Sequence, residues 1–291
     1  MKGLSIGLLT SERLPELAED EEPLVRALIE SGHEVLPIIW SGQNWAECDC
    51  LVFRNTWDYI HHFDEFLKFL DQVETSGLLT MNELGLIRSN LDKKYLKDLK
   101  SYGLPVVPTQ YFNGQELANL LPEEWVQQHR GEFVLKPTIS ADSTHTFRGS
   151  LDELLCTAHS ITLAKSFQWM LQPFLQSIID EGEFSLIFFN GEPSHCVLKK
   201  VKSGDFRVQD TYGGTALEHS VANHLWTLGR QFLNALPGIP IYARVDLVFW
   251  NEKPHLLELE LVEPSLFLKT NPHAGNLFAS AINRRIQQFF S

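Results

Sequence analysis

Acidic and apolar residues alternate near the carboxyl end of the chain, and this pattern carries the clearest chemistry. Asp246 lies in one strand-like run, 242–250, and Glu258 and Glu260 lie in a second, 255–262. Because successive side chains of a strand point to opposite faces, an antiparallel pairing of the two runs brings the three carboxylates onto one face. Such an array of oxygen ligands suits Mg²⁺, with Mn²⁺ as the alternative ion. The odd-numbered positions, which we expect in the core, are Val245, Leu247, Phe249, Leu257, Leu259 and Leu261.

A solvated polar face is the alternative interpretation of these acids, and it is the more common reason for such alternation. Like charges that face each other across a sheet are destabilising, so the acids need a compensating cation. No lysine alternates with them, which favours a metal slightly. If they bind a metal, the metal-free acids repel one another, and Glu258→Gln should leave the fold as stable as before or more stable.

Composition and charge narrow the class of protein. Hydrophobic residues make up 44% of the 291 residues and charged residues 21%, as in globular proteins. A net charge of −13 opposes binding to nucleic acid or to an anionic membrane. A phosphorylated ligand therefore needs a local group of basic side chains and a divalent cation. The cysteines are scattered, which predicts a protein without disulfides, and the absence of a signal peptide and of a long apolar span predicts a cytoplasmic location. A homodimer is a further possibility that the sequence does not decide.

Three lobes are expected, which gives a mixed α/β and α+β fold class. In residues 1–89, strands alternate with helical segments, which indicates an open parallel α/β lobe. Residues 90–174 indicate a small α+β lobe, and residues 175–291 a lobe of antiparallel hairpins. The first of these hairpins turns at Asn190 and Gly191, a pair typical of tight hairpin turns. The helices expected in the middle lobe cover 90–102, 115–121 and 151–164.

The order of several short motifs resembles that of the ATP-grasp superfamily, and the resemblance covers nearly the whole chain. Within it, the chain is similar to the branch of glutathione synthetase and the ribosomal-protein glutamate ligase, and most similar to the group containing the O-ureidoserine cyclo-ligase of cycloserine biosynthesis. The matching segments are R-N-T-W-D-Y at 54–59, L-D-K-K-Y-L at 91–96, E-G-E-F-S-L-I-F-F-N-G-E at 181–192, D-F-R-V-Q at 205–209 and L-E-L-E-L-V-E-P-S-L-F-L at 257–268. The resemblance implies an ATP-grasp fold with a substrate-side first lobe, a lid and a C-terminal lobe that holds magnesium.

A nucleotide site follows from the same resemblance. Lys93 and Lys136 correspond to the two lysines that hold the α and β phosphates. A lysine on an exposed helix face is ordinary, whereas Lys136 follows a buried strand, where a lysine without a partner is costly. Main-chain groups of a hinge meet the adenine and Glu183 accepts from the ribose hydroxyls, although a simple strand end explains the hinge segment equally well. The hinge residues are Gln172, Pro173, Phe174 and Leu175.

The resemblance also assigns Arg207 and Lys199 to charge at the transferring phosphoryl group, and the three acids to Mg²⁺. Two departures from the family stand out. Many relatives have asparagine at the position of Glu260, so the metal site of this chain carries an extra charge. The loop 140–146, which relatives build with glycine, has none, and Asp142 within it would repel phosphate.

A substrate site is expected at the end of the third strand, since open α/β sheets collect ligands at that edge. Arg54 would pair with a carboxylate and Asp58 with an amine, which suits an amino acid. The alternative is that Trp57 and Tyr59 only pack the lobe interface. The full set expected at the substrate is Arg54, Thr56, Trp57, Asp58 and Gln209.

The sequence therefore predicts an ATP-dependent ligase or cyclo-ligase that activates an amino-acid-like carboxylate as an acyl phosphate, transfers it to nitrogen, and releases ADP and phosphate. One alternative is a ligase that adds an amino acid to a peptide or protein, which a broad groove near Trp57 would favour. The other is a non-catalytic nucleotide-binding module, against which the retained lysines and acids argue. Glu263 and Ser265 lie just beyond the acids, at the expected mouth of the acceptor site.

Overall fold

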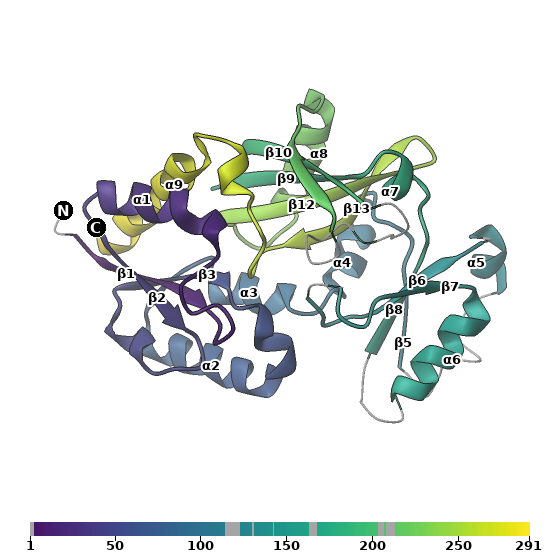
Figure 1. Cartoon of the computed structure of the whole chain (residues 1–291), viewed down its shortest axis with the longest axis horizontal. Coiled ribbons are helices and arrows are strands. Elements are labelled where there is room, and N and C mark those ends of the chain that lie inside the picture. Colours follow the sequence, from purple (N-terminus) through teal and green to yellow (C-terminus); the bar gives the residue numbers. More distant parts are fainter. Residues whose placement is uncertain are drawn as a thin grey trace.

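The computed structural model describes residues 3–113, 123–129, 131–141, 143–162, 168–202, 207 and 213–291. Within these residues, one sheet lies in each of the three expected lobes (Figure 1). The expected helix over 115–121, Asp142 of the loop and Gln209 of the substrate site lie outside the described residues. The lobe boundaries at 89/90 and 174/175 stay predictions.

The first lobe is a parallel sheet with strand order β2-β1-β3-β4, as the alternation of strands and helices predicted. Helices cover both of its faces, so the central strands are apolar on both sides. Ile6 and Leu8 pack with α1, whereas Leu51 and Phe53 pack with α2. The elements are β1 (Ser5–Thr10), η1 (Glu19–Glu21), α1 (Glu22–Glu30), β2 (Glu34–Ile39), η2 (Asn44–Glu47), β3 (Cys50–Asn55), η3 (Trp57–His61), α2 (Phe63–Ser76), β4 (Leu79–Met81) and α3 (Leu84–Asn90).

The last helix, α9 (Ala274–Phe290), returns to the first lobe and lies alongside α1 (Figure 1). Gly275 marks the closest approach, because a Cβ added there would lie 2.4 Å from the carbonyl oxygen of Pro23. Only glycine lets the two backbones meet so closely. The C-terminal segment therefore contributes to the core of the first lobe as well as to its own sheet.

The lid is an antiparallel sheet with strand order β5-β8-β6-β7, packed against α5 and α6. Its first strand begins at Gln110, after a segment in which Val107 N donates to Leu256 O and Pro105 O accepts from Leu256 N of the C-terminal sheet. Trp169 and Leu135 form the centre of its core. The elements are β5 (Gln110–Asn113), α5 (Glu123–Gln128), β6 (Phe133–Pro137), β7 (Phe147–Gly149), α6 (Leu151–Thr162) and β8 (Gln168–Pro173). Before them, α4 (Tyr95–Ser101) packs through Leu96 and Leu99 against the C-terminal sheet.

The C-terminal lobe is an antiparallel sheet with strand order β11-β10-β9-β12-β13. Asn190 and Gly191 both have positive φ, 51° and 76°, which confirms the tight turn predicted between β9 and β10. The elements are α7 (Ser177–Asp180), β9 (Glu183–Phe189), β10 (Glu192–Lys200), β11 (Thr215–Glu218), α8 (Asn223–Asn234), β12 (Tyr242–Trp250), β13 (Lys253–Glu260) and η5 (Leu268–Thr270).

Two local predictions were wrong. The helix expected over 90–102 begins only at Tyr95, and Lys93 lies in the preceding turn, where its backbone N–H bonds to Thr138 O at 2.9 Å. Leu257 is not in the core: the register between β12 and β13 shifts after the Asp246–Glu258 pair, and Leu257 faces a cavity. An irregularity of this kind reverses the parity of the residues beyond it.

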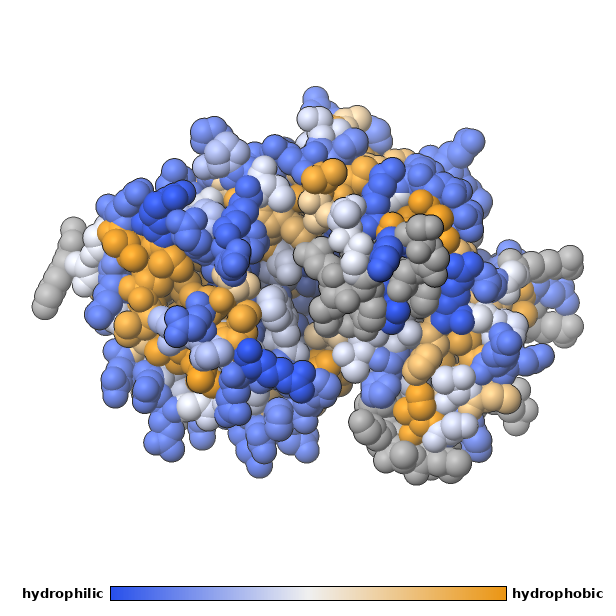
Figure 2. All heavy atoms as spheres, in the orientation of Figure 1, coloured by the Kyte–Doolittle hydropathy of each residue, from blue (hydrophilic) through white to orange (hydrophobic). Residues whose placement is uncertain are grey.

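Polar and charged side chains cover most of the surface in view, and a hollow separates the first lobe from the lid (Figure 2). The four cysteines are unpaired. No helix in the described part of the chain combines the length and the apolar character needed to cross a bilayer.

Candidate active site

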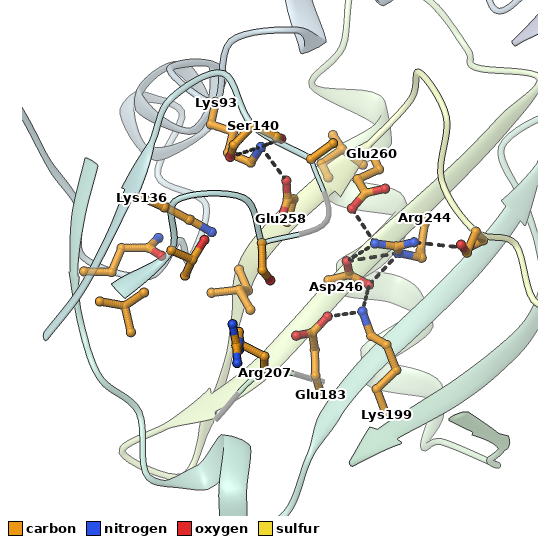
Figure 3. A pocket seen from close by; sticks show the side chains of 18 of the residues that line it. Lys93, Lys136, Ser140, Glu183, Lys199, Arg207, Arg244, Asp246, Glu258 and Glu260 are labelled. Carbon is orange, nitrogen blue, oxygen red and sulfur yellow. Dashed lines mark hydrogen bonds and ion pairs between the residues drawn. The ribbon is translucent and has the colours of Figure 1, made fainter. Parts of the chain in front are cut away.

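A cavity of about 440 Å³ lies where the three lobes meet, and its walls carry most of the side chains selected from the sequence (Figure 3). Every residue predicted to bind nucleotide or metal, or to neutralise the phosphoryl group, lines it: Lys93, Lys136, Gln172, Pro173, Phe174, Leu175, Glu183, Lys199, Arg207, Asp246, Glu258 and Glu260. Of the predicted substrate residues in the described part of the chain, Trp57 alone lines it. A volume of this order is typical of small-molecule sites.

Asp246 forms the centre of a charge network on the floor of the cavity (Figure 3). Its carboxylate accepts from Arg244 Nε at 3.0 Å and lies 3.4 Å from Lys199 Nζ, which also pairs with Glu183. Burial opposes ionisation, but Arg244 and Lys199 hold the pKa of Asp246 down at about 2. Asp246 and Glu183 in turn raise the pKa of Lys199, although burial alone would lower it. The ammonium of Lys199 therefore forms ion pairs with two carboxylates of the protein itself.

Glu258 and Lys93 form a second charged contact across the cavity. Lys93 Nζ lies 3.1 Å from Glu258 Oε1 and donates to the backbone oxygen of Ser140 at 2.5 Å. Burial opposes ionisation of Glu258, but Lys93 and Lys136 lower its pKa. The turn before α4 therefore carries a lysine that links the lid loop to the carboxylate face.

Lys136 points into the cavity from β6 (Figure 3). Its ammonium makes no hydrogen bond or ion pair with any residue that the structure describes. Burial lowers its pKa, the charge of Glu258 opposes this effect, and the charge of Lys93 adds to it. A partly buried ammonium without a partner is costly, so the position favours an anion from outside the protein.

The carboxylate face differs in one respect from the expectation of mutual repulsion. Asp246 pairs with Arg244 and Lys199, Glu258 with Lys93, and Glu260 with Arg244. The compensating cations are thus present in the protein itself. Arg244 lies two residues before Asp246 on β12, opposite Glu260 of β13, and was given no role from the sequence. Its even-numbered position, two residues before Asp246, was the signal that could have found it.

The donor chemistry of this face fits a hard divalent cation only when other ligands contribute. In the described residues, no three His, Cys, Asp or Glu side chains are placed to hold a metal by themselves. Mg²⁺ usually takes one or two carboxylates and completes its shell with water and substrate phosphates. The register that pairs Asp246 directly with Glu258 provides such a partial set.

Few backbone N–H groups of the hinge are available to hydrogen-bond to an adenine. Phe174 N already donates to Glu132 O at 2.9 Å, and Pro173 has no N–H. Leu175 therefore provides the remaining backbone donor of the segment 173–175. Gln172 is fixed by its side-chain bond to Thr109 Oγ1 at 3.0 Å.

The loop 140–146 replaces glycine with strained residues. Ser143 and His145 have φ of 54° and 56°, in the left-handed region that glycine favours. Two backbone bonds close its turns, from Thr144 N to Ala141 O and from Thr146 N to Ser143 O, both at 3.0 Å. The chain thus adopts a tight loop beside the cavity without glycine.

The substrate residues predicted in the first lobe need correction. Arg54 is fully buried outside the cavity wall, where Nε and Nη2 each lie 2.9 Å from the carboxylate of Glu21. Its guanidinium therefore faces Glu21 and not the cavity. Thr56 is also fully buried outside the wall, and its hydroxyl has no partner in the described residues. Asp58 accepts from Trp40 Nε1 at 2.7 Å, and Trp57 Nε1 donates to Glu263 O at 3.0 Å.

Comparisons with known proteins agree with this arrangement. A family model for the N-terminal domain of the D-cycloserine synthetase DcsG matches residues 6–82. The cycloserine biosynthesis protein DcsG of Streptomyces lavendulae is 32% identical over 267 residues, which cover 84% of this chain and 85% of that protein. The crystal structure of D-cycloserine synthetase DcsG matches with a TM-score of 0.86 and 27% identity, over 97% of this chain and 99% of that chain.

A more distant structure shares the fold. The D-alanine–D-alanine ligase of Bacillus anthracis matches with a TM-score of 0.70 and 14% identity, over 98% of this chain and 97% of that chain. The likeness in fold therefore extends over all three lobes.

Proposed function

The chain belongs to the DcsG family of ATP-grasp ligases, and on that premise we propose that its cavity binds ATP with Mg²⁺ beside an amino-acid-like substrate. The observation that carries this proposal is the convergence in one cavity of the unpartnered ammonium of Lys136, the carboxylate face and the hinge. Phosphates need cations, and the ribose and adenine need acceptors and backbone groups, all of which this cavity provides.

Each residue receives a role from its position. Lys136 and Lys93 bind the α and β phosphates, Leu175 N–H meets the adenine, and Glu183 accepts from the ribose with the oxygen that Lys199 leaves open. Asp246, Glu258 and Glu260 would hold Mg²⁺, which neutralises phosphate charge when bound. Lys199 stays bound to Asp246 and positions it, and Arg207 stabilises the charge that develops on the phosphoryl group.

The reaction follows from these positions. A carboxylate oxygen of the substrate attacks the γ phosphorus of ATP, so that the bond to the β-bridging oxygen breaks and ADP leaves. The nitrogen nucleophile then attacks the acyl carbon, phosphate leaves, and the nitrogen loses a proton. The compact cavity supports a small molecule as the substrate, such as the precursor of a cycloserine-like ring, over a peptide chain.

Thermal unfolding with nucleotide tests the proposal. We expect ADP with Mg²⁺ to raise the unfolding temperature more than either alone, because a ligand that binds only the folded state stabilises it. Lys136→Ala should reduce that shift, whereas Arg207→Ala should keep it and lower ATP-dependent phosphate release. The release assay uses amino acids and their O-substituted derivatives, O-ureidoserine among them. The proposal fails if nucleotide and Mg²⁺ together leave the unfolding temperature unchanged.

A further inference from the structure

The segment that follows β13 is held in an unusual way. Six consecutive backbone carbonyls, from Leu261 to Leu266, each lie within hydrogen-bond distance of a side chain from another part of the chain. We call residues 261–266 the strap. The contacts are Asn82 Nδ2 to Leu261 O at 2.8 Å, Tyr242 Oη to Val262 O at 2.8 Å, Trp57 Nε1 to Glu263 O at 3.0 Å, Arg54 Nη2 to Pro264 O at 2.9 Å, Arg244 Nη1 to Ser265 O at 3.1 Å and His195 Nε2 to Leu266 O at 2.9 Å.

These contacts explain the corrected residues of the first lobe. The strap is not a strand, so its carbonyls need partners from elsewhere. Arg54 and Trp57 supply two of them; Arg54 reaches the cavity only through the strap, whereas Trp57 also lines the cavity with its ring. They are therefore positioning residues, and they fix the backbone from which Glu263 and Ser265 line the cavity.

Glu263 is the exception among the acids of the cavity. The other four, Glu183, Asp246, Glu258 and Glu260, each pair with a lysine or an arginine. The carboxylate of Glu263 makes no hydrogen bond or ion pair with any residue in the described part of the chain. Burial, together with the neighbouring Glu260, raises its pKa to about 8, as expected for an acid that lacks a cation.

The residues around Glu263 indicate which chemical group of a ligand would fit beside it. Trp57, Tyr59 and Phe267 line the same cavity and offer aromatic surface. Aromatic faces together with one unpaired carboxylate suit an ammonium group, because the ammonium can form cation–π contacts with the rings and a charge-assisted hydrogen bond with the carboxylate. An anionic group of the substrate would be repelled there by Glu263 and Glu260.

We propose that Glu263, presented by the strap, binds the amino group of the substrate and makes the enzyme select substrates that carry a free α-amine. This proposal rests on the proposed function, because it takes the cavity to be the ligase site. It assigns specificity to the strap and not to the end of β3, where the sequence had placed an amine at Asp58.

The test compares two rings that differ only in the amine. D-cycloserine carries an amino group, and isoxazolidin-3-one is the same ring without it. Their dissociation constants are measured by calorimetry in the presence of ADP and Mg²⁺, for the unaltered protein, Glu263→Gln and Glu263→Asp. Glu252→Gln is the matched control, since Glu252 is an exposed acid in the turn after β12.

We expect the unaltered protein and Glu252→Gln to bind the amino ring at least about tenfold more tightly, as one charge-assisted hydrogen bond provides. Glu263→Gln should lose this preference and Glu263→Asp should keep part of it.

All variants should keep the ADP-induced rise in unfolding temperature, so loss of that rise in the unaltered protein would count against the ligase site and not against Glu263 alone. A preference that survives in Glu263→Gln, or equal or absent binding of the two rings to the unaltered protein, would overturn the proposal. So would a Glu263→Gln protein that loses only the Mg²⁺ dependence of ADP binding, since that would make Glu263 a metal ligand.

Discussion

Arg244 covers the carboxylate of Asp246 from two positions further back on the same strand. Its Nε lies 3.0 Å from both carboxylate oxygens, and its Nη2 contacts Glu260 as well. Arg244 is therefore the resident cation of the face at which we place Mg²⁺. Mg²⁺ bound at this face would therefore compete with the Arg244 guanidinium for the carboxylate oxygens of Asp246 and Glu260.

Arg244→Met should expose that competition. Without the guanidinium, Asp246 and Glu260 lose their shared partner, and removal of one member of a buried ion pair costs about 3–5 kcal/mol. We expect a large drop in the metal-free unfolding free energy, part of which Mg²⁺ alone restores. Denaturant unfolding across a Mg²⁺ series measures both effects. Equal Mg²⁺ responses in Arg244→Met and the unaltered protein would place the metal elsewhere.

Arg54 and Glu21 give a prediction that separates structure from substrate binding. Both side chains are buried, at 0% and 2% exposure, and they form a bidentate pair. Glu21→Gln should destabilise the fold by about 3–5 kcal/mol, because it leaves the Arg54 charge unpaired. Replacing both residues by methionine should cost much less than Glu21→Gln, since the buried charges disappear together. If Arg54 touched substrate, Glu21→Gln would change substrate affinity with little effect on the unfolding free energy.

Glu258→Gln now has a different expected effect on stability. The expectation of relief from repulsion was based on acids without cations, but Glu258 pairs with Lys93 at 3.1 Å. We expect a loss of about 1–3 kcal/mol, because the charged hydrogen bond is weakened while Lys93 stays buried. Mg²⁺-dependent phosphate release should fall sharply. Continued turnover in Glu258→Gln would rule out an essential role in holding the metal.

Glu263 predicts a pH dependence of the ligand-free protein. Its pKa is raised from 4.5 to about 8 by burial first and by Glu260 second, so the folded state retains a proton that the unfolded state releases. Stability is therefore highest below about pH 4.5 for this group and falls as the pH rises to 8. Glu263→Gln should flatten part of this decline. Unfolding temperatures between pH 5 and pH 8 measure it, and an unchanged slope in Glu263→Gln would assign the decline to other groups.

The sequence predicted the parts that depend on local patterns. Alternation in β12 and β13 placed Asp246, Glu258 and Glu260 on one face, and the Asn190–Gly191 turn fixed the hairpin register. These features depend on periodicity and turn chemistry, which a single sequence contains. Lys93 and Lys136, which both line the cavity, were selected through the family resemblance and not through a local pattern.

Partners that are distant in the sequence could not be predicted. Arg54 lies at the end of a strand, where arginine commonly meets a ligand, and nothing near it indicates that Glu21 and Pro264 O occupy its guanidinium. The register shift that turns Leu257 towards the cavity is likewise invisible to parity. Both depend on how separate segments pack, which local propensity does not specify.

The strap has a consequence for how such a cavity changes over time. Its backbone path is set by donors on β3, η3, β10, β12 and the loop after β4, so the side chains at positions 263 and 265 can be exchanged without changing that path. Selection for a new substrate could therefore act on two positions at little cost in folding. A library restricted to residues 263 and 265 should contain many folded proteins, and it would be an economical starting point for redirecting the ligase.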